Sequence, residues 1–117
     1  MPTIRENPDY VTQVNHIRVA PEDIDELISK MRRQLDTVIS EAPGFISSSI
    51  HRSHDGHHVL NYVQFETARQ FDDARALPAF QAQFAGYKAL VIEGGPHLYD
   101  VVRVRERLAP LPGTPVL

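Results

Sequence analysis

Residues 45–67, FISSSIHRSHDGHHVLNYVQFET, contain the pattern that decides the fold. Two apolar-rich runs, 45–52 and 57–67, are joined by Ser53-His54-Asp55-Gly56. An Asp-Gly pair between two such runs is a strong signal for a β-hairpin, because it readily forms the tight turn between antiparallel strands. The stretch therefore predicts two paired strands with their turn at Asp55-Gly56.

The position of the turn determines which side chains share a face of the hairpin, because successive strand residues point to opposite faces. One face is predicted to hold the cross-strand pairs Ile50 with Asn61, Ser48 with Val63, and Ile46 with Phe65. The other face holds Ser47, Ser49, His51, Leu60, Tyr62 and Gln64. This second face is polar but includes a leucine and a tyrosine, which suggests a subunit interface.

Asn61 is the amide that this register places on the same face as Val63 and Phe65, in a run that is otherwise patterned like a buried strand. An amide that faces the interior without hydrogen-bond partners costs about 1–3 kcal/mol, so a fold retains it for a reason. It either makes a structural hydrogen bond to a neighbouring segment or binds a ligand. The sequence leaves both interpretations open.

The segments before the hairpin predict a strand and a helix. Residues 10–19 mix Val and Ile with polar residues, as a first strand does. Pro21 opens a helix whose apolar residues recur at helical spacing up to Ala42, and Pro43-Gly44 ends it.

The segments after the hairpin predict a second helical region and a last strand. The helical region starts near Thr67, and Pro78 divides it into two short helices or kinks it. Gly94-Gly95-Pro96 is interpreted as a turn into a final strand at about 97–105.

This order of elements is the ferredoxin-like split βαβ pattern of the α+β class. It predicts a four-stranded antiparallel sheet with both helical regions on one face. Leu60, Tyr62, Tyr99 and Val101 would then lie on the bare face. Covering that face with a second copy is the simplest solution, so a homodimer is predicted.

Composition limits the remaining possibilities. The 117 residues predict one domain, 1–117, with a core at about 10–105 and a proline-rich tail at 106–117 that is expected to lie across the partner. A net charge of −3 argues against nucleic acid, and no apolar run is long enough to span a membrane. The chain has no cysteine, which fits a cytoplasmic protein.

Residues 42–56 and 59–67, together with Asn15 and the strand-like 98–102, resemble the antibiotic biosynthesis monooxygenase family of dimeric α+β barrel proteins. The resemblance implies the dimeric α+β barrel fold and a set of possible activities. Members include cofactor-independent oxygenases that convert polycyclic anthrones to quinones, and haem-degrading enzymes. In the oxygenases a strand asparagine binds or polarises the phenolic substrate, and this role would belong to Asn61, with Asn15 as a second polar residue.

Two positions depart from the family pattern. Phe65 stands where the oxygenases carry a tryptophan, and Phe71 stands where they carry a tyrosine. Haem degradation is disfavoured, because the tryptophan is replaced and no histidine lies between His58 and His97.

The predicted site is an apolar pocket between sheet and helices that holds a small aromatic molecule. Its predicted lining is Ile46, Val63, Phe65, Phe71, Phe80 and Phe84, with Asn61 and Asn15 as catalytic residues. No cofactor is expected, neither flavin nor haem. No metal site is expected either, because the histidines at 54, 57 and 58 sit on a hairpin tip without an enclosing shell.

Two functions remain open at this point. The first is a cofactor-independent monooxygenase that acts on a polyketide-like or quinol substrate. The second is a non-redox cyclase, isomerase or ligand-binding protein with the same pocket.

Overall fold

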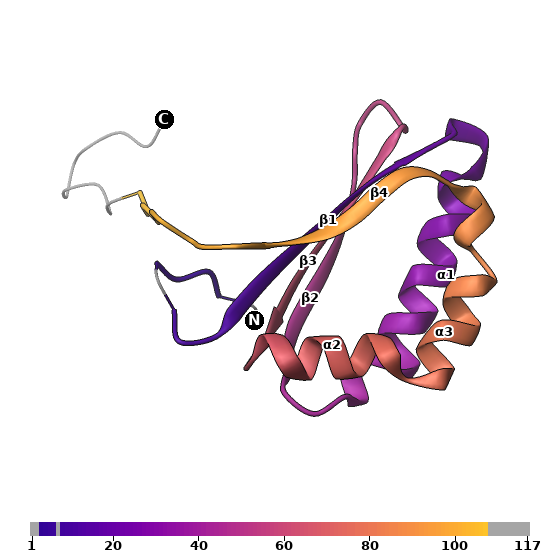
Figure 1. The fold of residues 1–117 in the computed structure, drawn as a ribbon. Helices are drawn as coiled ribbons and strands as arrows, with labels where there is room; N and C mark the ends of the chain where they lie inside the picture. The colour runs from indigo at the N-terminus through magenta and orange to yellow at the C-terminus, as the bar shows by residue number, and fades with distance from the viewer. Residues whose placement is uncertain (1–2, 7, 108–117) are drawn as a thin grey trace.

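The computed structural model describes residues 3–6 and 8–107, and its architecture is the predicted α+β fold (Figure 1). Its strands are β1 (Val11–Val19), β2 (Phe45–Arg52), β3 (His58–Phe65) and β4 (Val91–Tyr99). They form one antiparallel sheet in the order β2-β3-β1-β4. Helices α1 (Ile24–Thr37), α2 (Ala68–Ala76) and α3 (Pro78–Ala85) pack on one face of the sheet. The ferredoxin-like split βαβ prediction is confirmed.

The β2–β3 hairpin turns where its sequence predicts. Gly56 has a φ of +76°, a conformation that glycine adopts without strain. The Asp55 carboxylate accepts hydrogen bonds from the Ser53 hydroxyl, at 2.6 Å, and from the backbone N–H of His57, at 3.0 Å. These two bonds favour the ionised form and lower the pKa of Asp55.

Two of the three predicted cross-strand pairs are confirmed, and the third is wrong. Ile50 lies opposite Asn61 and Ser48 opposite Val63. The register then shifts between residues 45 and 47, so Phe45 takes the position opposite Phe65 that was predicted for Ile46. A bulge of this kind reverses the face of the residue it displaces, and Ile46 is 42% exposed.

The first helix ends earlier than predicted. Residues 21–23 form a short 3₁₀ helix, η1 (Pro21–Asp23), and α1 continues to Thr37. Val38 has non-helical dihedral angles, and η2 (Ile39–Glu41) follows. Three β-branched residues in a row, 37–39, disfavour further helix because their side chains crowd the preceding turn.

The second helical region is divided at Leu77, as its proline predicts. Leu77 adopts an extended conformation, with ψ of 136°, directly before Pro78. A residue before proline is pushed out of the helical region, and proline suits the first helical position that follows. The result is the two short helices α2 and α3, with η3 (Lys88–Leu90) leading into the last strand.

The last strand lies earlier in the chain than predicted. The predicted strand at about 97–105 is β4 at 91–99, and Gly94-Gly95-Pro96 lies inside it rather than in a turn. A Cβ atom on Gly94 would lie 3.2 Å from the carbonyl oxygen of His16, so glycine allows β4 to approach β1 closely. Pro96 is tolerated because β4 is an edge strand.

The core between the sheet and the helices is divided into two clusters. The first cluster consists of Ile17, Val19, Ile24, Leu27, Met31, Val59 and Tyr87. The second cluster consists of Ile39, Ala42, Val63, Phe65, Phe71 and Ala74. The space between them is where the candidate site lies.

The other face of the sheet is not covered by a helix (Figure 1). Leu60 and Tyr62 are half-buried there, and Tyr99 is 52% exposed. Val101 lies beyond the end of β4. The predicted homodimer would cover this face, and it stays a prediction.

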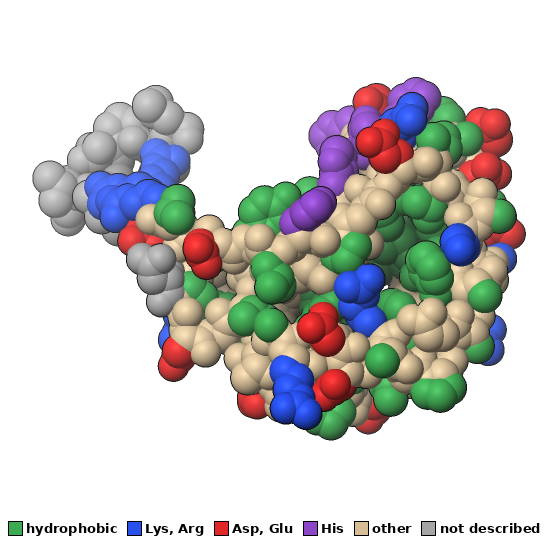
Figure 2. Space-filling model, viewed as in Figure 1, with side chains coloured by type: hydrophobic (Ala, Val, Ile, Leu, Met, Phe, Trp, Pro, Cys, Tyr) green, Lys and Arg blue, Asp and Glu red, His purple; other side chains and the backbone are tan. Residues whose placement is uncertain are grey.

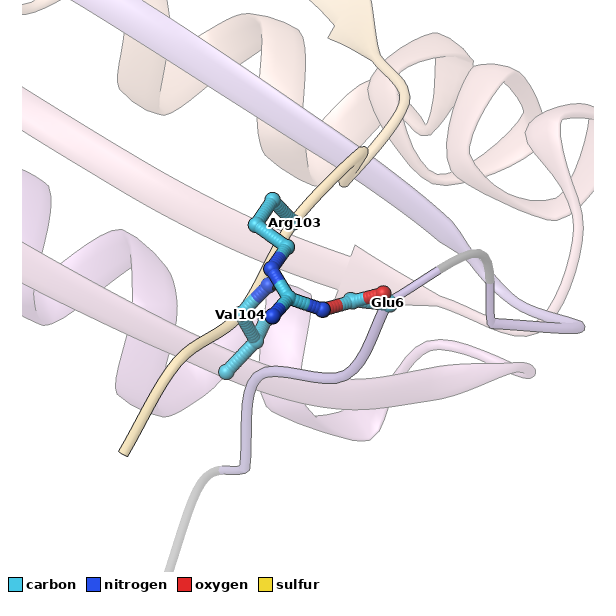
Figure 3. Close-up of polar contacts among 3 residues, drawn as sticks. All are labelled: Glu6, Arg103 and Val104. Atoms are coloured by element: carbon cyan, nitrogen blue, oxygen red, sulfur yellow. Dashed lines mark hydrogen bonds and ion pairs between the residues drawn. The ribbon is translucent and has the colours of Figure 1, made fainter. Parts of the chain in front are cut away.

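The two ends of the described chain are tied together beyond the sheet (Figure 3). The Glu6 carboxylate accepts hydrogen bonds from the guanidinium of Arg103, at 3.0 Å, and from the backbone N–H of Val104, at 2.7 Å. Most of the predicted proline-rich tail, 108–117, lies outside the described residues. Within the part of the chain that the structure describes, no helix is long and apolar enough to cross a membrane.

Candidate functional site

A cavity of about 320 Å³ lies between the sheet and the helices. Its size is at the lower end of the range of small-molecule sites. The space-filling view shows a hollow with hydrophobic side chains inside it and basic side chains beside it (Figure 2). The lining residues are Gln13, Asn15, Ile17, Met31, Gln34, Leu35, Ile39, Asn61, Val63, Phe71, Arg75, Phe80, Gln81, Phe84, Tyr87, Val91, Gly94, Gly95 and Pro96.

The cavity separates the two clusters of the core. The lining residues Ile17, Met31 and Tyr87 belong to the first cluster, and Ile39, Val63 and Phe71 belong to the second. A molecule in the cavity would therefore contact both clusters. Amide side chains interrupt this otherwise apolar lining, and they are the groups that can orient a ligand.

Asn61 on β3 is held by one hydrogen bond. The Ser48 hydroxyl on the neighbouring strand β2 donates to Asn61 Oδ1 over 2.7 Å. This bond occupies the amide oxygen and leaves the Nδ2 donors without a partner among the residues that the structure describes. The half-buried Asn61 thus presents N–H groups to the cavity.

Asn15 lies directly opposite Asn61 in the β1–β3 register. Its Oδ1 atom is buried and makes no hydrogen bond to any described residue. A buried acceptor without a partner costs free energy, and a donor on a bound molecule would remove that cost. The two strands therefore bring a free donor and a free acceptor to the same cavity.

Gln34 and Tyr87 also line the cavity, but their polar groups are engaged within the protein. The Tyr87 hydroxyl donates to Gln34 Oε1 at 2.7 Å, and Gln34 Nε2 donates to the carbonyl oxygen of Phe80 at 3.1 Å. Burial raises the pKa of Tyr87 to about 12. The phenol therefore stays protonated near neutral pH and is a poor base.

Sequence reasoning missed several lining residues. Gln13 is 6% exposed and precedes Asn15 by two positions, so the period of the strand places both on one face. Gln34 follows Met31 by three positions on the buried side of α1. Arg75 follows Phe71 by four positions on α2, and its guanidinium carbon lies 5.8 Å from the centroid of the Phe71 ring. These spacings were the signals available in the sequence.

The structure brings most of the predicted site residues together. Six of them, Asn15, Asn61, Val63, Phe71, Phe80 and Phe84, line the cavity. Phe65 lies behind it in the core, 1% exposed, with its ring edge-on to Phe71 at a centroid distance of 4.9 Å. Ile46 is placed elsewhere: because of the bulge it lies beside Tyr10 and Gln64, in a separate depression. The prediction that Ile46 lines the cavity is wrong.

The hairpin tip carries the histidines at 54, 57 and 58, which lie close together in the sequence. Among residues 3–6 and 8–107, no group of three or more His, Cys, Asp or Glu side chains is arranged to hold a metal ion. The cavity lining itself contains no histidine, aspartate or glutamate. Its chemistry therefore depends on amides, one phenol and one guanidinium.

The fold and the cavity define an α+β domain with a candidate site for a small, largely apolar molecule. The model of the antibiotic biosynthesis monooxygenase family matches residues 10–86. The chain is 38% identical over 84 residues to tetracenomycin-F1 monooxygenase of Streptomyces glaucescens, covering 72% of this chain and 75% of that protein. The chain belongs to the antibiotic biosynthesis monooxygenase family.

Solved structures share the fold of this chain. SnoaB, a cofactor-independent oxygenase from Streptomyces nogalater, superposes with a TM-score of 0.64 at 23% identity, covering 88% of this chain and 100% of that one. A conserved protein from Methanosarcina mazei superposes with a TM-score of 0.70 at 13% identity, covering 78% of this chain and 91% of that one. At these identities the likeness concerns the fold.

Proposed function

We propose that the chain is a cofactor-independent monooxygenase that oxidises a polycyclic phenolic substrate of the anthrone type. The observation that carries the proposal is Asn61, which lines a largely apolar cavity: Ser48 holds its amide oxygen, and its N–H donors have no partner in the described part of the chain. Family membership, the activity named for the Streptomyces glaucescens relative and the oxygenase activity named for SnoaB support it.

The reaction needs no external reductant, because the substrate supplies the electrons. An anthrone loses a proton from its central methylene carbon and becomes an electron-rich enolate. Dioxygen accepts electrons from this carbon and forms a C–O bond, giving a hydroperoxide after protonation. The hydroperoxide then loses water and leaves a ketone. The methylene carbon has lost two hydrogens and gained one oxygen atom, and the other oxygen atom has left as water.

Asn61 would act on the oxygen that carries the negative charge of the enolate. A preorganised N–H donor in a cavity with little water stabilises such a charge more than water does. Asn15 would accept a hydrogen bond from a second hydroxyl group of the substrate through its buried Oδ1. The two amides would then fix the orientation of a flat ring system between the two core clusters.

The absence of a base from the described lining favours a second candidate. The lining offers no carboxylate and no imidazole, and the pKa of Tyr87 is raised to about 12. A monooxygenase without a base in its cavity depends on an acidic substrate. The substrate must lose its proton to water once Asn61 binds the substrate oxygen. The second candidate is a non-redox cyclase, isomerase or ligand-binding protein that uses the cavity only to shape its ligand.

We also propose that the chain forms a homodimer through the open face of the sheet. The Thr12 Oγ1 and Tyr62 hydroxyl groups are buried there without hydrogen-bond partners among the described residues. Tyr99 adds an exposed aromatic ring on the same face. A second copy would supply hydrogen-bond partners for the two hydroxyl groups and would cover the Tyr99 ring.

Oxygen consumption separates the two candidate functions. Metal-free protein is mixed with a panel of anthrones and hydroquinones, while dissolved oxygen and quinone absorbance are recorded together. We expect one oxygen molecule consumed per quinone formed from an anthrone, at a rate proportional to enzyme concentration. Saturable binding of the same compounds without enzyme-dependent oxygen uptake would instead establish the non-redox function. The Asn61→Ala variant, melted to confirm that it folds, is the matched control.

A further inference from the structure

Arg75 lies in the last turn of α2, at the junction with α3, and its half-buried side chain lines the cavity. Its guanidinium lies over the Phe71 ring, which is itself part of the lining. Arg75 is also close to Tyr87, which follows α3 in the chain. Burial raises the pKa of the Tyr87 phenol, and the positive charge of Arg75 acts in the opposite direction and lowers it. The cation therefore belongs to the cavity rather than to the outer surface.

The guanidinium of Arg75 has no anionic partner among the residues that the structure describes. The ion pairs among the described residues involve Arg18, Lys30, Arg52 and Arg103. Arg75 makes none of them, and its backbone carbonyl, not its guanidinium, accepts the hydrogen bond from Gln81 Nε2 at 2.6 Å. Its N–H donors are therefore available to a bound molecule, and a guanidinium carries five of them in a planar fork.

The rest of the lining carries no charge to balance Arg75. No aspartate or glutamate is among the described lining residues, so residues 3–6 and 8–107 give the cavity one positive charge and no negative charge. A basic residue in the last turn of a helix also complements the helix dipole, but that role does not require the side chain to line a cavity. The surplus charge indicates that the ligand is an anion.

We propose that Arg75 binds a carboxylate on the substrate and selects aromatic substrates that carry one. This inference rests on the proposed function and names its substrate class. A carboxylate matches the planar fork of a guanidinium with two parallel hydrogen bonds, which a lone phenolate oxygen cannot do. In this arrangement Asn61 holds the reacting end of the ring system, and Arg75 holds the carboxylate at the α2 end of the cavity.

A matched pair of substrates tests the assignment. The pair is a dihydroxyanthrone that carries a carboxylate and the same dihydroxyanthrone with a methyl group at that position. For Arg75→Gln we expect kcat/KM on the carboxylate to fall by roughly 10–100-fold, mainly through KM, since a charge-assisted bond is lost. On the methyl compound we expect a change of less than about threefold. Arg75→Lys keeps the charge without the fork and should lie between wild type and Arg75→Gln.

The control variant is Arg69→Gln on the same helix. Arg69 is exposed and does not line the cavity, so both substrates should behave as with wild type. Melting curves of all variants confirm that they fold. An equal loss on both substrates with Arg75→Gln, or no loss on either, would overturn the proposal.

Binding of the two corresponding anthraquinones separates this proposal from the proposed oxygenation, because anthraquinones are already oxidised. Titration followed by quinone absorbance should show tighter binding of the carboxylated quinone to wild type, and this preference should disappear in Arg75→Gln. If that result is obtained but no anthrone is turned over, the oxygenase function fails while Arg75 keeps its role. If wild type shows no preference for the carboxylated quinone, the role of Arg75 is wrong whatever the turnover.

Discussion

Strand β3 carries two amide side chains, Asn61 and Gln64, on opposite faces of the sheet, and their surroundings differ sharply. Gln64 is 1% exposed, and both ends of its amide are bonded. Its Oε1 accepts from the Ser47 hydroxyl at 2.6 Å, and its Nε2 donates to the carbonyl oxygen of Thr3 at 2.8 Å and to the Tyr10 hydroxyl at 3.3 Å. The Asn61 side chain has only the bond from Ser48 among the described residues.

The difference shows how to tell a structural amide from a ligand-binding one. Gln64 ties the segment before β1 to the sheet, and both its amide oxygen and its amide nitrogen are bonded within the protein. Asn61 is only oriented by the protein, and its donors face a cavity. Both residues look alike in the sequence, as amides in an apolar strand. The predictions below test whether the two roles separate in this way.

The largest effect is expected at Asn61. Asn61→Ala removes the donor that would stabilise the substrate oxygen, so turnover should fall by roughly 10²–10³-fold. Asn61→Asp should be at least as damaging, because a carboxylate repels the developing negative charge in a cavity of low dielectric. The melting temperature of Asn61→Ala should stay close to that of wild type, because the protein makes only one hydrogen bond to this side chain.

Turnover of a confirmed substrate and melting temperature are measured on the same protein samples. Near-normal turnover in Asn61→Ala would show that Asn61 is not the catalytic residue. A fall in melting temperature with turnover reduced only in proportion to the unfolded fraction would make Asn61 a structural amide like Gln64.

A smaller and different effect is expected at Gln64. Gln64→Ala leaves the Ser47 hydroxyl and the Thr3 carbonyl without their partner, so the free energy of unfolding should fall by about 1–3 kcal/mol. The melting temperature should drop by several degrees, while turnover per folded molecule stays unchanged. Thermal unfolding and kinetics below the transition measure the two quantities. Loss of turnover in fully folded Gln64→Ala would contradict the proposed division of roles.

The smallest effect concerns Tyr87 at alkaline pH. The folded state holds the phenolic proton more tightly, since burial raises the pKa of Tyr87 from 10.0 to about 12. The stabilisation linked to this group is complete below about pH 10 and is lost as pH rises through about 12. Comparing the unfolding free energies of wild type and Tyr87→Phe between about pH 9 and 12 isolates the contribution of the Tyr87 phenol. An equal alkaline decline in both proteins would assign the loss to other groups.

Local signals account for the parts of the fold that the sequence predicted well. The Asp-Gly turn, the period of the first helix and Pro78 each act within a few residues, and the elements they predict are present. The predicted position of the last strand is wrong because Gly94-Gly95 suggests a turn, whereas Gly94 instead permits close approach to His16 on another strand. The displacement of Ile46 depends on a bulge that no local pattern marks.

The candidate site was only partly predictable for the same reason. Asn61 stood out because it interrupts an apolar strand, and Asn15 because the family pattern marks it. Gln34 and Arg75 come from two different helices and meet the sheet residues only in the folded chain. Neither looks unusual in its own segment, since a glutamine or arginine on an amphipathic helix is ordinarily solvated. Which of them faces a cavity depends on how three elements pack.

The division of the core into two clusters has a consequence for finding the natural substrate. A molecule that fills the cavity contacts residues of both apolar clusters, so it would complete the interior as well as react there. Ligand that binds only the folded chain raises its stability by about 2.7 kcal/mol at a concentration a hundred times Kd. Screening polycyclic compounds for a rise in melting temperature would therefore identify candidate substrates before any reaction is observed.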